Sequence, residues 1–196
     1  FAANWRFDMK RILLAITGAS GAIYGIRLLQ ALRASGLAEV HLILSEAACW
    51  TVPHETGLSA AEVETFADHS YRWNEIWQLP ASGSYPMDSM VIAPCSMKTL
   101  AAIRIGLGDT LITRSADVAI KEHRQLILCP RESPLSAIHL DNMAYLAHLG
   151  VCILPPMPGF YHKPQSIEDL ICHHTMKVFD QLQLPFPQAH RWNPDE

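Results

Sequence analysis

Short runs of consecutive apolar residues alternate in this chain with longer stretches where apolar residues recur every three or four positions. A continuous run is typical of a strand buried on both faces, and the spaced pattern of an amphipathic helix. The runs, of which the second is interrupted by His41, predict strands at 12–16, 40–44, 90–93, 126–129 and 151–154. The spaced pattern predicts a helix through Ile23, Ile26, Leu29 and Leu32, ended by Gly36, and helices at about 46–53, 59–67, 97–105, 113–122, 137–149 and 166–183.

This alternation of strand and helix predicts the fold class. Short apolar strands joined by helices form right-handed crossovers and a parallel sheet with helices on both faces. We therefore expect one α/β domain with a mainly parallel, doubly wound sheet over residues 9–196, including a C-terminal helix and tail. Residues 1–8 precede a Met9-Lys10-Arg11 that looks like a natural start, so we expect them to be a remnant of processing or expression.

Composition excludes several classes of function. The chain has 196 residues, 49% of them hydrophobic, which supports a packed core. Its net charge of −4 gives no basic field for nucleic acid, and no apolar run reaches the roughly 18 residues that span a bilayer. Five widely spaced cysteines without a C-x-x-C pair favour a reducing compartment. We expect a cytoplasmic protein that binds neither nucleic acid nor membrane.

The segments that follow the predicted strands are polar or rich in Gly and Pro. In doubly wound sheets, ligands bind outside the carboxyl ends of the strands. These ends share one edge of the sheet, so the segments that follow them are expected to meet there. The segments are 17–21, 45–46, 94–99, 130–134 and 155–161.

The turn at 18–21 joins a strand to a helix N-terminus, where free N–H groups and the helix dipole favour an anion. The turn is neither G-x-G-x-x-G nor a P-loop, which argues against NAD and nucleoside triphosphates. Ser20 and Ser45 would add hydroxyls that suit a phosphate and a ribityl chain. An ordinary tight turn explains the motif equally well.

Polar residues at the other strand ends allow two interpretations each. Ser96 is either a helix N-cap or part of a second phosphate cradle. Arg131 and Glu132 directly follow a buried strand. They are either a pair of active-site residues or a structural ion pair. Arg114 and Lys121 are seven residues apart and can share one helix face, where such charges are usually solvated.

The remaining candidates are less specific. Tyr161 follows a Pro-rich loop and Lys177 lies about three turns into the last predicted helix, and either could be packing or surface. The histidines at 54, 123, 139, 148, 173 and 174 show no H-E-x-x-H spacing, and there is no Asp-Asp-x-x-Asp run, so no metal is expected. The aromatic segment 71–77 is expected in packing or at a subunit interface.

Four ordered motifs together resemble the UbiX-type flavin prenyltransferases, long named aromatic or phenylacrylic acid decarboxylases. The motifs are T-G-A-S-G-A-I-Y-G at 17–25, P-C-S-M-K-T at 94–99, P-R-E-S-P-L at 130–135 and P-P-M-P-G-F-Y at 155–161. The resemblance runs from about Met9 to Trp192. It implies a Rossmann-like flavoprotein with a three-layer sandwich that binds FMN and forms a homo-oligomer, usually a dodecamer, with active sites between subunits.

The resemblance also implies an activity and a set of site residues. The family joins a dimethylallyl group from dimethylallyl monophosphate to N5 and C6 of reduced FMN without a metal, and a UbiD-type aromatic acid decarboxylase uses the product. The residues implied to contact FMN are Gly18, Ala19, Ser20, Ser45, Ser96, Met97, Lys98, Thr99 and Arg131. Those implied around the prenyl phosphate are Lys121, Glu132, Tyr161, Lys177, Arg114, Glu55, which reaches a neighbouring subunit's site, and Trp192, which closes over the site.

The implied catalytic roles agree with the chemistry of these side chains. Lys121 and Lys177 can stabilise the leaving phosphate, Glu132 can act as acid and base, and Ser20 can relay protons near N5. Family members commonly carry Arg where this chain has Lys177, so the charge is kept and the bidentate fork is lost.

Two other functions stay open at this point. One is an FMN-dependent decarboxylase of the phosphopantothenoylcysteine type, which uses a catalytic His and a P-A-S-A-N-T-like motif where this chain has P-C-S-M-K-T. The other is a non-catalytic flavin carrier or accessory subunit of a decarboxylase, against which the charged residues Lys121, Glu132 and Lys177 argue.

Overall fold

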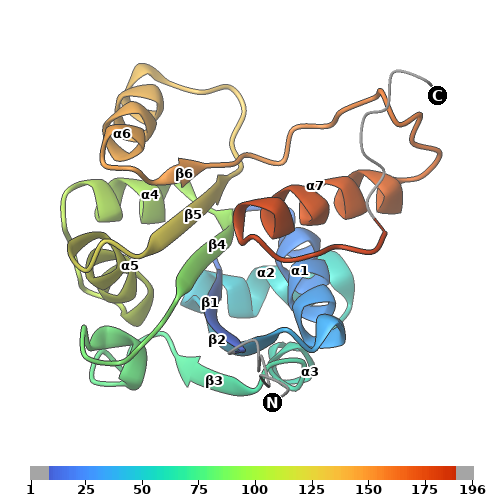
Figure 1. Cartoon of the computed structure of the whole chain (residues 1–196). Coiled ribbons are helices and arrows are strands. Elements are labelled where there is room, and N and C mark those ends of the chain that lie inside the picture. The colour runs from blue at the N-terminus through green and yellow to red at the C-terminus, as the bar shows by residue number, and fades with distance from the viewer. Residues whose placement is uncertain (1–8, 189–196) are drawn as a thin grey trace, which may run out of the picture.

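The computed structural model describes residues 9–188, which form a six-stranded parallel sheet between two layers of helices (Figure 1). The strand order is β3-β2-β1-β4-β5-β6, so the prediction of a doubly wound α/β fold is confirmed. The elements are β1 (Lys10–Ile16), α1 (Ala22–Ser35), β2 (Ala38–Leu44), α2 (Glu46–Thr56), α3 (Ala60–Glu64), β3 (His69–Arg72), the 3-10 helix η1 (Leu79–Ala81), β4 (Ser89–Cys95), α4 (Met97–Arg104), α5 (Leu111–Lys121), β5 (Gln125–Pro130), α6 (Ala137–His148), β6 (Cys152–Ile153) and α7 (Ile167–Gln181).

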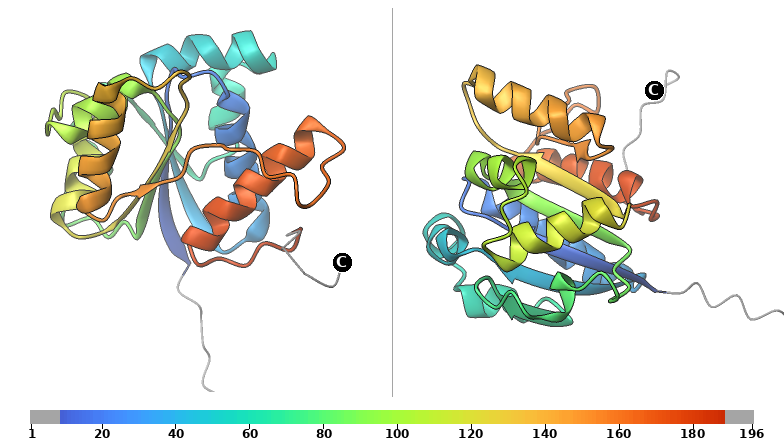
Figure 2. Two further views of the ribbon diagram at one scale, coloured as in Figure 1. Left: turned by 90° about the horizontal axis from the view of Figure 1, so that it is seen from above. Right: turned by 90° about the vertical axis from the view of Figure 1, so that its left-hand side faces the viewer.

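Both faces of the sheet are buried, which is why its central strands read as continuous apolar runs. Along β1, Ile12, Leu14 and Ile16 pack into a core shared with α1, α2, α3 and α7. Leu13 and Ala15 point the other way, into a core shared with α4, α5 and α6. Figure 2 shows α1 and α7 on one side of the sheet and α4, α5 and α6 on the other.

Side-chain and glycine caps set the ends of several helices. Ser45, Ser96 and Ser166 cap α2, α4 and α7 by accepting the N–H of the residue three positions on, at 3.0, 3.2 and 3.2 Å. The capping box predicted from Ser166 and Asp169 is confirmed. Gly36 ends α1 in the left-handed conformation, with φ of 65°, as the sequence predicts.

The main error of the sequence prediction is a missing strand. β3 pairs only with β2, and its sequence, His-Ser-Tyr-Arg, contains no apolar run because most of this edge strand is exposed. The aromatic segment 71–77, interpreted as packing or a subunit interface, therefore begins inside a strand.

Other boundaries differ by a few residues. The strand predicted at 151–154 is reduced to the two residues of β6, and the helix predicted at 59–67 to α3. The helix predicted to stop at Pro53 runs on to Thr56, because Pro53 lies on the exposed side of α2 and the helix continues past its missing N–H.

A close approach of α1 to β4 depends on Gly25. A Cβ at this position would overlap the carbonyl oxygen of Ala93 and lie 2.8 Å from Cγ1 of Ile16. We expect Gly25→Ala to lower the free energy of unfolding by about 3 kcal/mol, because α1 must move off the sheet. Urea unfolding of the flavin-free protein measures this loss.

Gly108→Ala is the matched control, since a Cβ there meets its nearest atom at an ordinary 3.6 Å and its φ is not left-handed. It should change stability by less than about 0.5 kcal/mol. Equal losses in the two variants would contradict the close-packing explanation.

Two expectations from composition can be compared with the structure. All five cysteines carry free thiols, and burial raises the pKa of Cys95 to about 12. Burial also raises the pKa of Cys129, so neither of these core thiols ionises near neutral pH. Within residues 9–188, none of the helices is long and apolar enough to cross a bilayer.

Candidate functional site

The carboxyl ends of β1 and β4 flank the point where the order of the strands reverses. After β1 the chain builds β2 and β3 on one side, and β4 begins the other side. Thr17, 1% exposed, ties the two ends together. Its hydroxyl donates to the carbonyl of Pro94 at 2.7 Å and accepts the N–H of Ser96 at 2.8 Å. The floor of the site is therefore fixed by buried hydrogen bonds.

Three helices begin at this edge, after three neighbouring strands. α1, α2 and α4 follow β1, β2 and β4, so their N-termini lie close to one another. Ser96 is the N-cap of α4, which confirms the simpler of its two interpretations, and its hydroxyl lies 3.0 Å from that of Thr99. All residues expected to contact FMN lie at this edge, namely Gly18, Ala19 and Ser20 after β1, Ser45 after β2, Ser96, Met97, Lys98 and Thr99 after β4, and Arg131 after β5.

Glu55 occupies the N-terminus of α1. Its Oε2 accepts the N–H of Gly21 at 2.8 Å and that of Ala22 at 3.0 Å. Burial alone would raise the pKa of Glu55, but the hydrogen bonds from Ser20, Ala22 and Gly21 and the charge of Arg131 hold it below its usual value. Glu55 is therefore ionised near neutral pH.

This contact bears on two expectations. The first N–H groups of α1 bind a carboxylate of the same chain, so they are not the free anion site predicted from the turn. The N-termini of α2 and α4 remain as positions for an external phosphate. Glu55 lies beside Ser20 of its own chain, and its expected reach to a neighbouring subunit's site stays a prediction.

Arg131 connects the end of β5 to the turn after β1. Its Nε donates to the carbonyl oxygen of Ser20 at 2.9 Å, across the end of β4. The carboxylate of Glu132 is exposed and accepts the N–H of Ser133 at 3.0 Å. Among the described ion pairs, none joins Arg131 to Glu132, so the interpretation as a structural ion pair is not supported. The carboxylate is available for chemistry at the strand ends.

Tyr161 contacts α7, the helix that carries Lys177. The hydroxyl of Tyr161 lies 2.7 Å from Nε2 of His173, and Lys177 is one helical turn further along α7. Burial, a neighbouring histidine and the charge of Lys177 lower the pKa of His173. The next residue, His174, packs edge-on against Tyr24 in the first turn of α1, with ring centroids 5.2 Å apart. The expected grouping of Tyr161 with Lys177 stays a prediction, with His173 as the residue of α7 that Tyr161 contacts.

Lys121 lies at the opposite edge of the sheet from Glu132 of the same chain. Lys121 ends α5 just before β5 begins and pairs with Glu122, whereas Glu132 follows the end of β5. Six residues of strand separate the two edges by about 17–20 Å. Arg114 is hydrogen-bonded to Asp117 at 2.7 Å, on the half-exposed side of α5. Within one described chain, both fit the solvated charges considered from sequence.

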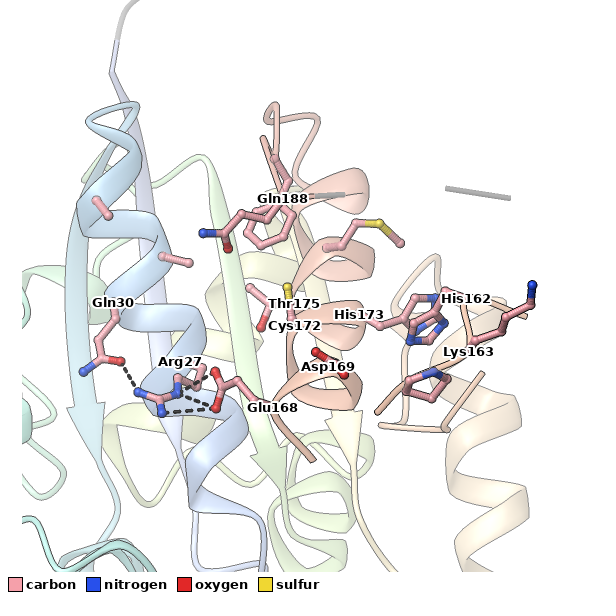
Figure 3. A pocket seen from close by; sticks show the side chains of 15 residues that line it. Arg27, Gln30, His162, Lys163, Glu168, Asp169, Cys172, His173, Thr175 and Gln188 are labelled. Atoms are coloured by element: carbon pink, nitrogen blue, oxygen red, sulfur yellow. Dashed lines mark hydrogen bonds and ion pairs between the residues drawn. The ribbon is translucent and has the colours of Figure 1, made fainter. Parts of the chain in front are cut away.

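A separate pocket lies between α1 and α7 (Figure 3). Its volume is about 590 Å³, and none of the residues expected to contact FMN lines it. The guanidinium of Arg27 on α1 donates to the carboxylate of Glu168 on α7 at 3.1 and 3.2 Å. His162 and His173 line the pocket, and it is therefore adjacent to Tyr161 rather than to the ends of β1 and β4.

Two sequence expectations fall outside the described residues, and one cluster of side chains was not predicted. Trp192 lies outside the described residues, as do residues 1–8, so their expected roles stay predictions. A cluster formed by Glu39, His41 and His69 was missed altogether. The two-residue spacing of Glu39 and His41 was the only local signal, and it becomes informative only once β3 is known to pair with β2.

The chain is similar to known flavoproteins over nearly its whole length. Residues 5–183 match the model of the family described as "Flavoprotein". The flavin prenyltransferase LpdB of Lactiplantibacillus plantarum is 50% identical over 187 residues, covering 95% of this chain and all of the relative. The solved structure of AnUbiX (PadA1) in complex with FMN and dimethylallyl pyrophosphate superposes with a TM-score of 0.93, at 45% identity over 95% of this chain and 99% of that one.

Another solved structure adds an assembly. The dodecameric FMN-dependent UbiX-like decarboxylase from Escherichia coli O157:H7 matches with a TM-score of 0.92 and 46% identity, over 93% of this chain and 99% of that one. The FMN-dependent cysteine decarboxylase TvaF matches at 18% identity with a TM-score of 0.60, over 73% of this chain and 88% of that one, a likeness of fold alone.

Proposed function

Because the chain belongs to the flavoprotein family and is a UbiX-like flavin prenyltransferase, we propose that the carboxyl edge of β1, β2, β4 and β5 is where reduced FMN binds and is prenylated. The observation that carries this proposal is the link from Arg131 to the backbone of Ser20. It joins segments that lie 111 residues apart at the ends of β5 and β1. Between them lies the strand-order reversal where such folds bind ligands.

The residues at this edge fit FMN. A phosphate needs a positive, hydroxyl-rich position, and the N-termini of α2 and α4 provide two helix dipoles with Ser45 and Ser96 at their caps. Lys98, exposed in the first turn of α4, adds a full positive charge. The negative charge of Glu55 would repel a phosphate from the N-terminus of α1. The phosphate would therefore bind at the N-termini of α2 and α4. The flavin ring would then lie towards Ser20 and Arg131.

When bound, reduced FMN supplies the nucleophilic N5 and C6 atoms and a π-face. The protein's own groups handle charge and protons. Glu132 would deliver a proton to the donor phosphate as its bond to the allyl carbon breaks, and would help to remove the proton from C6. Lys177 would stabilise the negative charge on the leaving phosphate. The hydroxyl of Ser20 lies beside the carboxylate of Glu55, which would orient it for proton relay.

A second subunit would supply Lys121 and Arg114. Lys121 lies at the sheet edge opposite the strand-end site of its own chain, and Arg114 pairs with Asp117, although the family resemblance places both at the prenyl phosphate. A relative is described as dodecameric, and we propose the same assembly for this chain, with its active site at a subunit interface.

Mixed oligomers test this arrangement. Lys121→Ala and Glu132→Gln should each abolish most activity alone. Coexpressed in equal amounts, they should recover about a quarter of native activity, because that share of sites combines an intact Glu132 from one subunit with an intact Lys121 from another. No recovery in an oligomer shown to contain both variants would place the two residues in the same chain.

The proposed product determines the partner and the compartment. A prenylated FMN is of use to a UbiD-type aromatic acid decarboxylase, and we propose that the chain supplies one. Reduced flavin and five free thiols suit the cytoplasm. Charge stabilisation by lysines would replace a metal, so prenyl transfer should be unaffected by EDTA.

Anaerobic incubation with reduced FMN and dimethylallyl monophosphate tests the function. Mass spectrometry should show a flavin heavier by one C₅H₈ unit. The diphosphate is the donor form named for the AnUbiX complex, and a parallel reaction compares the two. An unchanged flavin with both donors would overturn the proposal. Release of CO₂ from phosphopantothenoylcysteine would favour the cysteine decarboxylase instead.

A further inference from the structure

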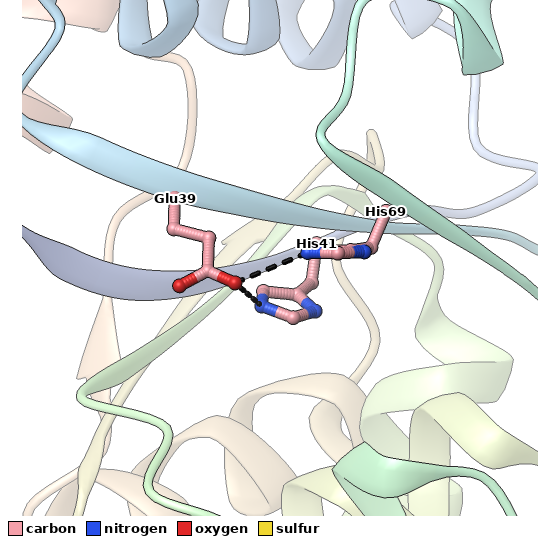
Figure 4. Close-up of side chains that lie close together, drawn as sticks. All are labelled: Glu39, His41 and His69. Carbon is pink, nitrogen blue, oxygen red and sulfur yellow. Dashed lines mark hydrogen bonds and ion pairs between the residues drawn. The ribbon is translucent and has the colours of Figure 1, made fainter.

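Three side chains with metal-binding atoms meet on one face of the sheet, near the amino ends of β2 and β3 (Figure 4). Parallel pairing places His41 of β2 opposite His69 of β3. Glu39 lies two residues before His41, and therefore on the same face of β2. The cluster is at the opposite end of the strands from the proposed flavin site, and no step of the proposed mechanism uses it.

The spacing of the three groups fits a shared ion. Oε1 of Glu39 is 3.1 Å from Nε2 of His69 and 3.5 Å from Nε2 of His41. The three ligand atoms all lie within 4.8 Å of one another. Two zinc bonds of about 2.0–2.1 Å at a tetrahedral angle hold their ligand atoms about 3.3 Å apart. Both measured distances lie close to that value.

His41 gives the independent sign of a missing ligand. Its side chain is fully buried, yet its Nε2 has no hydrogen-bond partner among residues 9–188, where Oε1 of Glu39 stays 3.5 Å away. A buried polar atom without a partner is rare in folded proteins. Nδ1 of His41 lies 2.8 Å from the hydroxyl of Tyr71. If Nδ1 carries the proton and donates to Tyr71, the lone pair on Nε2 points towards Glu39, as in a metal-binding histidine.

The neighbouring residues orient the carboxylate of Glu39 and leave the cluster accessible to an ion from solvent. Nε of Arg11 donates to Oε2 of Glu39 at 2.9 Å, which holds the carboxylate while Oε1 faces the two histidines. Such outer contacts are common around metal ligands. The side chain of His69 is 50% exposed, so an ion can enter from solvent and keep a water ligand.

We propose that Glu39, His41 and His69 form a binding site for a divalent transition-metal ion of the zinc class. Two imidazoles and one carboxylate, with a fourth position open to water, are a donor set that suits Zn²⁺, Co²⁺ or Ni²⁺ better than Mg²⁺ or Ca²⁺. The ion would join the edge strand β3 to β2. Its role would be structural, because it lies a strand's length away from the proposed chemistry.

Titration calorimetry of the chelator-treated full-length protein with ZnCl₂ tests the site. We expect one ion per chain, bound at least tenfold more weakly by His69→Ala and by Glu39→Gln. His148→Ala, an exposed histidine at the end of α6, should bind zinc as the native chain does. With Co²⁺, the native chain should show the visible absorption of a tetrahedral site, and the two ligand variants should lose it.

Hydrogen exchange supplies a second readout. Zn²⁺ should slow exchange of the backbone amides of β3 in the native protein and leave them unchanged in His69→Ala. Absence of zinc binding by the native chain would overturn the proposal, and so would binding that is equal in native protein and both ligand variants. FMN binding by each variant verifies that it is folded. The prenyl-transfer assay is independent of these outcomes, so the two proposals fail separately.

Discussion

Replacing Glu132 by glutamine is expected to lower the rate of prenyl transfer by about 10²–10⁴-fold, the usual contribution of a positioned acid or base. The amide keeps the size of the side chain and cannot exchange a proton with the donor phosphate or with the flavin. FMN affinity should change by no more than about twofold, because the one hydrogen bond of this side chain within residues 9–188 is accepted from the N–H of Ser133. Anaerobic single-turnover kinetics and FMN titration measure the two quantities separately.

Glu64→Gln is the matched control, since Glu64 is an exposed carboxylate on α3, on a different part of the surface. It should leave both the rate and the affinity unchanged. If Glu132→Gln still supplied a UbiD-type decarboxylase at the native rate, Glu132 would have no catalytic role. The interpretation as a flavin carrier would then gain support.

Replacing His174 by leucine is expected to remove a large pH dependence of stability. Burial, followed by the charge of His173, lowers the pKa of His174 to about 4 from its usual 6.5. Above pH 6.5 the ring is neutral in both the folded and the unfolded chain, so its protonation does not change the free energy of unfolding. As the pH falls towards 4 only the unfolded chain binds the proton, which destabilises the native protein by up to about 3 kcal/mol.

The stability difference between His174→Leu and the native protein should therefore grow in favour of the variant by about 3 kcal/mol between pH 7 and pH 4. Urea unfolding across this range measures it. His148→Leu, at an exposed position, should follow the native pH dependence. Parallel curves for His174→Leu and the native protein would mean that His174 accepts a proton without penalty in the folded state.

The central part of the fold could be predicted from sequence because burial on both faces leaves an unmistakable pattern. Residues 12–16 and 126–129 are apolar without interruption, residues 40–44 are apolar except for His41, and each segment forms most of a strand in the sheet. β3 could not be predicted, because an edge strand contacts one neighbour and tolerates polar residues such as His69 and Arg72. Its existence depends on pairing with β2, which no local pattern records.

The candidate site was predictable where it depends on strand ends. Ser20, Ser45, Ser96 and Arg131 all follow strands, and parallel topology alone brings them to one edge. The subunit whose site Lys121 serves could not be predicted, since a motif match does not say which subunit's site a residue serves.

Contacts between distant segments are the other part that sequence could not give. The bond from Glu55 to the start of α1 depends on how α2 packs beside it. The cluster of Glu39, His41 and His69 likewise depends on strand pairing.

The most direct test of the central claim is an experimental structure of the assembled protein with FMN and dimethylallyl phosphate bound. The flavin phosphate should lie at the N-termini of α2 and α4, beside Ser45 and Ser96. The isoalloxazine should lie between Ser20 and Arg131, with Lys121 approaching from another subunit. Flavin bound instead in the pocket between α1 and α7, or at the edge that holds Lys121 of the same chain, would contradict it.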